Sequence, residues 1–159
     1  EIDVNGKRVS STRIRESLKE GRIQEVNQFL GRPYTISGKV VEGDKRGRQM
    51  GFPTANIALD EEYKLVPQNG VYVVQAEIDG NFIFGMMNIG FNPTVQGKQK
   101  TIEVHFFDFE ADIYNRKIQV AILQRIRSEK KFESIELLTK QLEEDRNFSR
   151  NYLQNLENK

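Results

Sequence analysis

A glycine-rich basic loop is the first stretch of the sequence that could do chemistry. It spans residues 43–51, where three glycines alternate with basic side chains: Gly43, Lys45, Arg46, Gly47, Arg48 and Gly51. Glycines let a backbone turn tightly and present N–H groups to an anion, and basic side chains add positive charge for phosphate oxygens. Composition alone favours an ordinary solvated loop, and neither a Walker A nor a dinucleotide-binding glycine pattern occurs.

A proline–threonine–alanine–asparagine string follows this loop at residues 53–56. Thr54 and Asn56 lie two residues apart, so in an extended segment their side chains point to the same side. Hydroxyl and amide oxygens are hard, neutral ligands that suit Mg²⁺, which takes further ligands from water and nucleotide phosphates. The alternative is an ordinary turn in which the asparagine bonds to nearby backbone.

Glu103 is the third candidate, because it lies in a stretch where apolar and polar residues alternate. Ile102, Val104 and Phe106 share one face of the expected strand, and Glu103 lies on the other face with His105. A carboxylate in that place could act as a general base or could simply face solvent, and periodicity does not separate the two. His105 has no second histidine to share a metal with, so a structural or surface role is the simpler interpretation.

Composition limits what these residues can belong to. The chain has 159 residues, 24 Lys+Arg, 23 Asp+Glu, a single histidine and no cysteine. This length suits one domain with a short appendage. The lack of cysteine excludes disulfide scaffolds, iron–sulfur sites and thiol nucleophiles. A net charge of +1 argues against a nucleic-acid binder that relies on bulk charge. No apolar run reaches the length of a membrane span and no signal peptide is visible, so we expect a cytoplasmic protein.

Helices are expected at both ends of the chain. Ser10, Ser11 and Thr12 can cap a helix that stops at Gly21, and a second helix fits Ile23 to Leu30 with Gly31 as its C-cap. The pattern thus predicts that the first thirty residues are helical. Ser134 can cap a C-terminal helix whose polar last part, residues 145–159, is expected to fray.

Between these helices the hydrophobic period changes to two. Strands are predicted over 34–41, 70–78, 81–89, 101–107 and 117–126, with a short extended segment after Pro53 and loops over 42–51 and 90–100. Asp79-Gly80 is a strong hairpin signal. Five or six strands with short connections favour an antiparallel barrel or sandwich.

The order of these motifs resembles that of riboflavin kinase. The basic loop is followed by G-F-P-T-A-N at 51–56, N-I-G-F-N-P-T at 88–94, I-E-V-H-F-F at 102–107 and R-x-E-x-K-F-x-S at 127–134. The resemblance covers about residues 31–149. It implies a mainly β fold, a six-stranded antiparallel Greek-key barrel with short N-terminal helices and a C-terminal helix. The barrel and the C-terminal helix would occupy residues 31–159, and the short helices would precede them.

The resemblance also implies a reaction and a role for each matching residue. The ATP γ-phosphoryl group would pass to the ribityl 5′-hydroxyl of riboflavin, giving FMN and ADP. Glu103 matches the catalytic carboxylate, and Thr54 and Asn56 match the ligands of Mg²⁺ and phosphate. The expected ATP/ADP contacts are Gly43, Lys45, Arg46, Gly47, Arg48, Gly51, Pro53 and Tyr114. The expected flavin contacts are Asn88, Arg127 and Phe132, with the segment after Arg127 closing over the flavin. Asn115 stands where the family often has glycine, and asparagine is the next-best residue if that turn needs a positive φ.

A second resemblance concerns the first thirty residues. Residues 9–15, V-S-S-T-R-I-R, are similar to the motif that closes the FMN adenylyltransferase module of bacterial bifunctional FAD synthetases. That module also needs an H-x-G-H motif, and His105 is the sole histidine of this sequence. We therefore expect residues 1–30 to be the C-terminal stub of an adenylyltransferase module, and the start at Glu1 to reflect a fragment. FAD synthesis is not expected.

Two other functions fit parts of the pattern. A small barrel with a basic loop could bind single-stranded nucleic acid through stacking aromatic residues, although the near-neutral charge weakens this interpretation. The second is a flavin carrier or a regulator that has lost catalytic activity. The joint presence of Glu103, Thr54 and Asn56 argues against it. The expected partners are therefore riboflavin/FMN and ATP/ADP, and neither nucleic acid nor a membrane.

Overall fold

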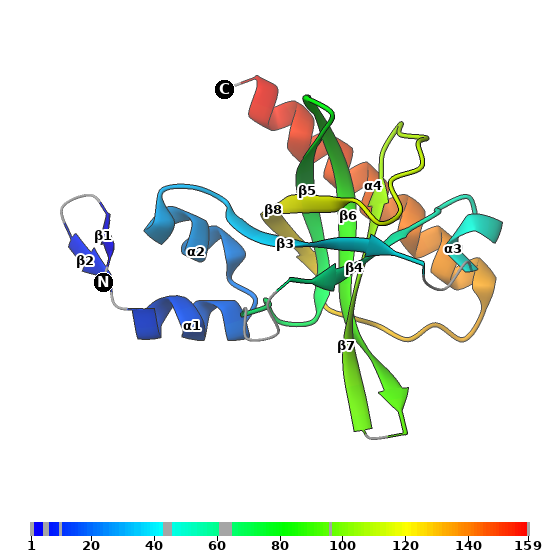
Figure 1. Cartoon of the computed structure of the whole chain (residues 1–159), viewed down its shortest axis with the longest axis horizontal. Helices are drawn as coiled ribbons and strands as arrows, with labels where there is room; N and C mark the ends of the chain where they lie inside the picture. Colours follow the sequence, from blue (N-terminus) through cyan, green and yellow to red (C-terminus); the bar gives the residue numbers. More distant parts are fainter. Residues whose placement is uncertain are drawn as a thin grey trace.

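The computed structural model describes residues 2–4, 7–9, 11–42, 46–60, 65–95 and 97–158. Its centre is a closed barrel of six strands in the order β3-β4-β7-β6-β5-β8 (Figure 1). All neighbouring strands pair antiparallel. The strands are β3 (Tyr34–Val41), β4 (Ala55–Leu59), β5 (Gly70–Ile78), β6 (Asn81–Thr94), β7 (Gly97–Phe106) and β8 (Lys117–Arg127).

The connectivity is that of a Greek key. Strands β5, β6 and β7 follow one another as hairpins, and β8 then returns to lie beside β5. Closure between β8 and β3 pairs the edges that an open sheet of these strands would expose. The mainly β, six-stranded antiparallel barrel predicted from the sequence is confirmed.

Tight turns in the barrel occur where the sequence indicated them. Asp79 and Gly80 both have positive φ, 53° and 80°, as the predicted two-residue hairpin turn requires. Asn115 has φ 65°, so this asparagine does adopt the left-handed conformation that glycine or asparagine supplies most easily. Gly31 ends the second helix with φ 72°.

The segment 90–100 is not the loop that we predicted. Strand β6 runs on to Thr94 and β7 begins at Gly97, with Phe91 opposite Lys100 and Pro93 opposite Lys98. These residues project as a two-stranded hairpin beyond the rest of the barrel (Figure 1). A proline is compatible with this position because, among the described residues, β6 beyond Ile89 pairs with β7 only, and prolines occur in strands at sheet edges. The glycine and proline residues that suggested a loop therefore belong to an edge hairpin.

The first thirty residues are not entirely helical either. Two strands, β1 (Ile2–Val4) and β2 (Lys7–Val9), pair with each other before α1 (Ser11–Lys19) and α2 (Ile23–Leu30). Each strand has three residues, which is too short for a period of two to show in the sequence. The two predicted helices themselves are confirmed. A short helix, α3 (Arg46–Gln49), also lies within the loop predicted at 42–51.

Helices α1 and α2 pack into the same apolar core as the barrel. Their buried residues Ile14, Leu18, Ile23 and Val26 belong to one cluster with barrel residues such as Ile36, Tyr72 and Ile122. The backbone N–H of Gln68, in the segment before β5, also donates to the carbonyl of Leu18 at 2.9 Å. The boundary expected between residues 30 and 31 thus separates two elements that share a core.

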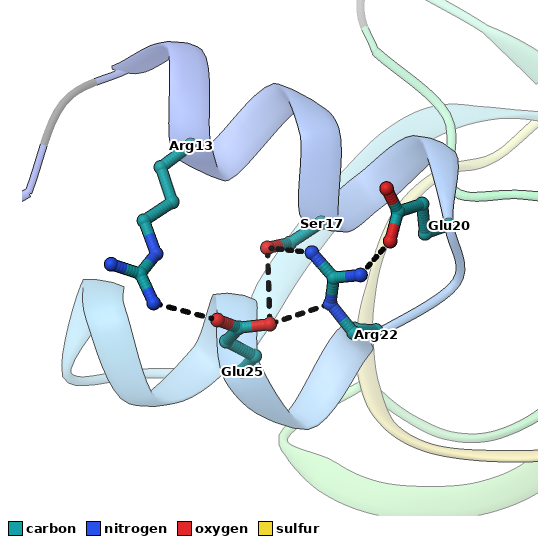
Figure 2. A network of polar contacts seen from close by, with 5 residues as sticks. All are labelled: Arg13, Ser17, Glu20, Arg22 and Glu25. Carbon is teal, nitrogen blue, oxygen red and sulfur yellow. Dashed lines mark hydrogen bonds and ion pairs between the residues drawn. The ribbon is translucent and has the colours of Figure 1, made fainter.

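A polar network joins the two helices on their other side (Figure 2). The Glu25 carboxylate accepts bonds from Arg22 Nε at 2.6 Å, Ser17 Oγ at 3.3 Å and Arg13 Nη2 at 3.4 Å. Arg22 also pairs with Glu20. The Arg22 guanidinium is the main cause that lowers the pKa of Glu25. The network links α2 to α1, since Glu25 of α2 bonds to two residues of α1.

The C-terminal helix α4 (Ile135–Glu157) covers a second, smaller apolar cluster outside the barrel. Ser134 caps it as predicted, accepting from the Leu137 N–H at 3.2 Å. The cluster consists of Phe52, Val71, Met86 and Phe107, with Leu142 and Leu153 of α4 packed against it. The polar stretch that we expected to fray stays helical to Glu157, because it contributes to this packing.

Asn27 attaches α2 to the barrel, and its replacement tests that attachment. Its Nδ2 donates to the Ile122 carbonyl and its Oδ1 accepts from the Tyr34 N–H, both at 2.8 Å. Asn27→Ala leaves both part-buried backbone groups without this partner, so we expect a loss of about 2 kcal/mol in the free energy of unfolding in urea. Gln28→Ala, at an exposed neighbouring position, is the control. Equal stability of the two variants would contradict this role.

Candidate functional site

Three of the candidate residues lie side by side across three strands. Glu103 of β7 is directly opposite Asn56 of β4 on one side and Asn88 of β6 on the other. Directly opposite residues in antiparallel strands point to the same face, with Cβ atoms about 4.5–5.5 Å apart. We call Asn56, Glu103 and Asn88 the cross-strand row. All three side chains are half-buried.

The cross-strand row lies on the outside of the barrel. Ile102 and Val104, the neighbours of Glu103, point into the main core. Across β6 the register continues from Asn88 to Val71 of β5 and then to Arg127 of β8. Asn88 and Arg127, the two flavin-side candidates on strands, are therefore on the same line of residue pairs as Glu103.

The described part of the basic loop folds back onto the segment before β4. The Gly47 carbonyl accepts from the N–H of Phe52 at 2.7 Å and from that of Met50 at 3.1 Å. A Cβ at Gly47 would lie 2.3 Å from the Phe52 carbonyl oxygen, so only glycine fits there. Gly51 has φ 82°, and Arg48 is exposed. Gly43 and Lys45 lie outside the described residues, as does the side chain of Arg46.

Thr54 is half-buried. The two residues before it, Phe52 and Pro53, both contact other parts of the structure. Phe52 is buried in the second cluster, and the Pro53 carbonyl lies 2.8 Å from Nδ1 of His105. Beyond Thr54, Ala55 pairs with Val104 and Asn56 with Glu103. The structure thus places Thr54 next to the cross-strand row, one residue outside the β4 ladder.

The turn that carries Tyr114 is attached to the end of β3. The Asn115 N–H donates to the Val40 carbonyl at 2.8 Å, and the Val40 N–H donates to the Arg116 carbonyl at 2.9 Å. The next residue of β3, Val41, pairs with Asn56. Tyr114 is exposed on this turn. The predicted ATP-side residues come from the basic loop, from residues 53–54 and from the turn with Tyr114. All three segments adjoin the end of β3 or the start of β4.

Arg127 is fixed by an ion pair with α4. Its Nε and Nη2 bond to the Asp145 carboxylate at 2.9–3.0 Å, and Asp145 is only 1% exposed. Gln141 Nε2 donates to the same carboxylate at 3.0 Å. The Phe132 ring lies 5.7 Å from the Arg127 guanidinium carbon. The structure therefore brings Arg127 and Phe132 together, with Arg127 joining β8 to α4.

Asp145, the partner of Arg127, is a residue that the sequence analysis did not single out. A signal for Asp145 existed, since it and Ser149 continue the helical spacing of Leu138 and Leu142 on the buried side of α4. Ser149 is fully buried and donates to the Asp145 carbonyl at 2.8 Å. A buried acid on an apolar stripe needs a basic partner, and Arg127 supplies it.

An open cavity of about 510 Å³ lies between α1, β6, β7 and the segment that follows Arg127, and none of the three flavin-side candidates is among its lining residues. Its walls include Phe91, Arg125, Ser128 and Glu129. The Glu129 carboxylate lies close to Gly90, since a Cβ there would be 2.0 Å from its Oε2 and a larger residue would require this side chain to move. The segment after Arg127 thus rests directly on β6, two residues from Asn88.

Comparison with known proteins identifies the family to which this fold and site belong. The family model for riboflavin kinase matches residues 30–153. The bifunctional riboflavin kinase/FMN adenylyltransferase of Bacillus subtilis is 46% identical over 153 residues, which is 94% of this chain and 48% of that protein. The protein of the same name from Escherichia coli K12 is 40% identical over 88% of this chain and 44% of its own length.

Two solved structures share this fold, and one of them is a riboflavin kinase. A riboflavin kinase from Trypanosoma brucei superposes with a TM-score of 0.54 at 29% identity, covering 77% of this chain and 80% of its own. A Streptococcus pneumoniae crystal structure described as a macrolide-efflux protein superposes with a TM-score of 0.86 at 39% identity, covering 94% of this chain and 49% of its own. Within the described residues, no helix has the length and apolarity needed to cross a membrane.

The barrel with its polar outer row is thus that of a small-molecule kinase. The chain belongs to the riboflavin kinase family. It spans about half the length of the curated relatives that it matches.

Breaking the Arg127–Asp145 pair should be costly, because it leaves a charged group mostly buried without its partner. For Asp145→Ala we expect a loss of about 3 kcal/mol in the free energy of unfolding, measured by urea denaturation. Glu144→Ala removes an exposed acid one residue earlier and should change it by less than about 0.5 kcal/mol. Near-equal stability of the two variants would show that the ion pair does not hold α4 in place.

Proposed function

We propose that this chain transfers the γ-phosphoryl group of ATP to the ribityl 5′-hydroxyl of riboflavin, giving FMN and ADP. The cross-strand row carries the proposal. It sets a carboxylate between two amides at a place that adjoins both the folded basic loop and the segment after Arg127. In phosphoryl transfer the protein mainly positions the reactants and neutralises charge, and this arrangement provides groups for both tasks.

In this proposal Glu103 is the general base. Its carboxylate accepts the proton of the 5′-hydroxyl as the hydroxyl oxygen bonds to the γ-phosphorus and the bond to the β,γ-bridging oxygen breaks. ADP leaves with that oxygen. Asn88, on the β6 side, and Arg127 and Phe132, beyond it, form the flavin side of the site. A positioned base of this kind contributes about 10²–10⁴-fold to the rate.

Mg²⁺ fits the donor groups on the β4 side of Glu103. Thr54 and Asn56 supply a hydroxyl and an amide oxygen, and Asn56 stands directly beside the Glu103 carboxylate. Such hard oxygen donors are what Mg²⁺ uses when phosphates and water complete its shell. When bound, Mg²⁺ would neutralise charge on the β- and γ-phosphate oxygens. The described part of the loop, with Gly47, Arg48 and Gly51, and the exposed Tyr114 form the nucleotide side, together with Pro53.

The N-terminal residues relate this chain to a longer enzyme. We propose that residues 1–30 are the end of an FMN adenylyltransferase module, as in the bifunctional relatives. The support is the V-S-S-T-R-I-R string at 9–15 and the 48% coverage of the Bacillus subtilis protein. FMN made by the barrel would be the substrate of that module.

The direct test is incubation of this chain with riboflavin, ATP and Mg²⁺, followed by chromatography of the flavins. FMN without FAD is the expected result. Formation of FAD would refute the stub proposal for residues 1–30, and a lack of FMN would refute the kinase proposal.

The Glu103→Gln variant tests the base. The amide cannot take the proton, so we expect kcat to fall about 10²–10⁴-fold. The fluorescence of riboflavin should still be quenched on binding in the presence of Mg-ADP, because the side chain keeps its size. Glu77→Gln, which changes an exposed glutamate on β5, is the control and should keep full activity. Full turnover by Glu103→Gln would rule out the role.

Two variants test the hydroxyl of Thr54, one that removes it and one that keeps it. Thr54→Val keeps the shape but removes the oxygen, so we expect the apparent KM for Mg-ATP to rise about tenfold or more. Thr54→Ser keeps the oxygen and should remain within about threefold of the parent protein. An unchanged magnesium dependence in Thr54→Val would exclude Thr54 as a ligand. Steady-state kinetics at varied Mg²⁺ provides the measurement.

A further inference from the structure

His105 lies beside the candidate site in a place that the proposed reaction does not use. It is two residues after Glu103 on β7, so both side chains point to the outer face of the barrel. Its Nδ1 is 2.8 Å from the carbonyl oxygen of Pro53. Pro53 directly precedes Thr54, which is the proposed magnesium and phosphate ligand.

The direction of this hydrogen bond fixes the state of the imidazole. A carbonyl oxygen can only accept, so the proton must be on Nδ1 of His105. Burial is the main influence on the pKa of His105 and lowers it. The bond to Pro53 opposes this change, and the charges of Arg146 and Arg150 on α4 lower the pKa further. The ring therefore donates through Nδ1, and its burial favours the uncharged form.

Aromatic rings hold the imidazole in place from both sides. Phe52 meets it edge-to-face at a centroid distance of 5.2 Å, and Phe107 does so at 5.7 Å. Two arginines of α4 lie over these phenyl rings, Arg146 at 4.9 Å from the Phe52 centroid and Arg150 at 5.6 Å from that of Phe107. Such packing leaves the ring little freedom, so its donor stays aimed at Pro53.

The bond to Pro53 completes the attachment of residues 53–56 to strand β7. Asn56 pairs with Glu103 and Ala55 with Val104, and the pairing between β4 and β7 ends there. Thr54 therefore stands between a backbone pairing on one side and the His105 side chain on the other. Without His105, Pro53 and Thr54 would be held through the contacts of Phe52 before them and the strand pairing of Ala55 after them.

We propose that His105 is a positioning residue, which fixes the Pro53 carbonyl and thereby aims Thr54 at the magnesium–nucleotide complex. The inference rests on the proposed function, because it assigns the consequence of this bond to the nucleotide half of that site. His105 acts through Pro53 and touches neither flavin nor phosphate in this role.

Two substitutions separate the hydrogen bond from simple packing. His105→Leu keeps apolar bulk but has no donor. His105→Asn keeps an N–H close to the position of Nδ1, although it places a polar amide among the aromatic rings. We expect His105→Leu to raise the KM for Mg-ATP about tenfold while the KM for riboflavin changes less than about twofold. His105→Asn should return the KM for Mg-ATP to within about threefold of the parent value. This order of KM values is expected even if His105→Asn has the lower melting temperature of the two variants.

A spectroscopic measurement tests the hydrogen bond without any turnover. His105 is the single histidine of the chain, so its ring nitrogens give one unambiguous set of signals in a long-range ¹H–¹⁵N spectrum. We expect the Nδ1–H tautomer in the protein without ligands, and a shift of that signal when Mg-ADP is added.

The outcomes of the two measurements are distinct. A chain that forms no FMN refutes the proposed function, and the tautomer then still decides whether His105 holds Pro53. An Nε2–H tautomer, equal nucleotide KM values for the leucine and asparagine variants, or a parallel rise in both KM values overturns the positioning role. Rescue by asparagine together with the Nδ1–H tautomer supports it.

Discussion

The pairing of β7 with a different neighbour on each edge is the constraint on which the site depends. Asn56 and Asn88 come from strands that are far apart in sequence, and both are aligned by the same residue, Glu103. If either ladder shifted by one residue, the polar side chain of the shifted strand would point into the core. An apolar side chain would take its place on the outer face. Ile102 and Val104, buried on either side of Glu103, oppose such a shift.

Helix α4 supplies the second constraint, and it does so with charged side chains. Asp145 fixes Arg127 on β8, whereas Arg146 and Arg150 lie over the aromatic rings that enclose His105. One stretch of helix thus contacts both the flavin side and the nucleotide side of the proposed site. Because an acid as buried as Asp145 is stable only with its partner, the position of the helix along β8 is well defined.

Local features of the fold could be predicted from the sequence, because they depend on neighbouring residues. Asp79-Gly80, Gly31 and Ser134 have the conformations or bonds that their types favour. The strand pair β4–β7 depends on contacts between distant segments, so the closeness of Asn56 and Glu103 came from the resemblance alone. Pro93 and Gly97 favoured a loop over residues 90–100, which was wrong, since such turn-forming residues also occur in edge hairpins. Asp145 and His105 likewise bond to residues that are distant in sequence, so neither contact could be predicted.

The attachment of α2 to the barrel has a mechanical consequence. Asn27 bonds at once to β8 and to the start of β3, the two strands whose pairing closes the barrel. A force applied to α2 would therefore act on the edges of β3 and β8 where they pair, through the two hydrogen bonds of Asn27.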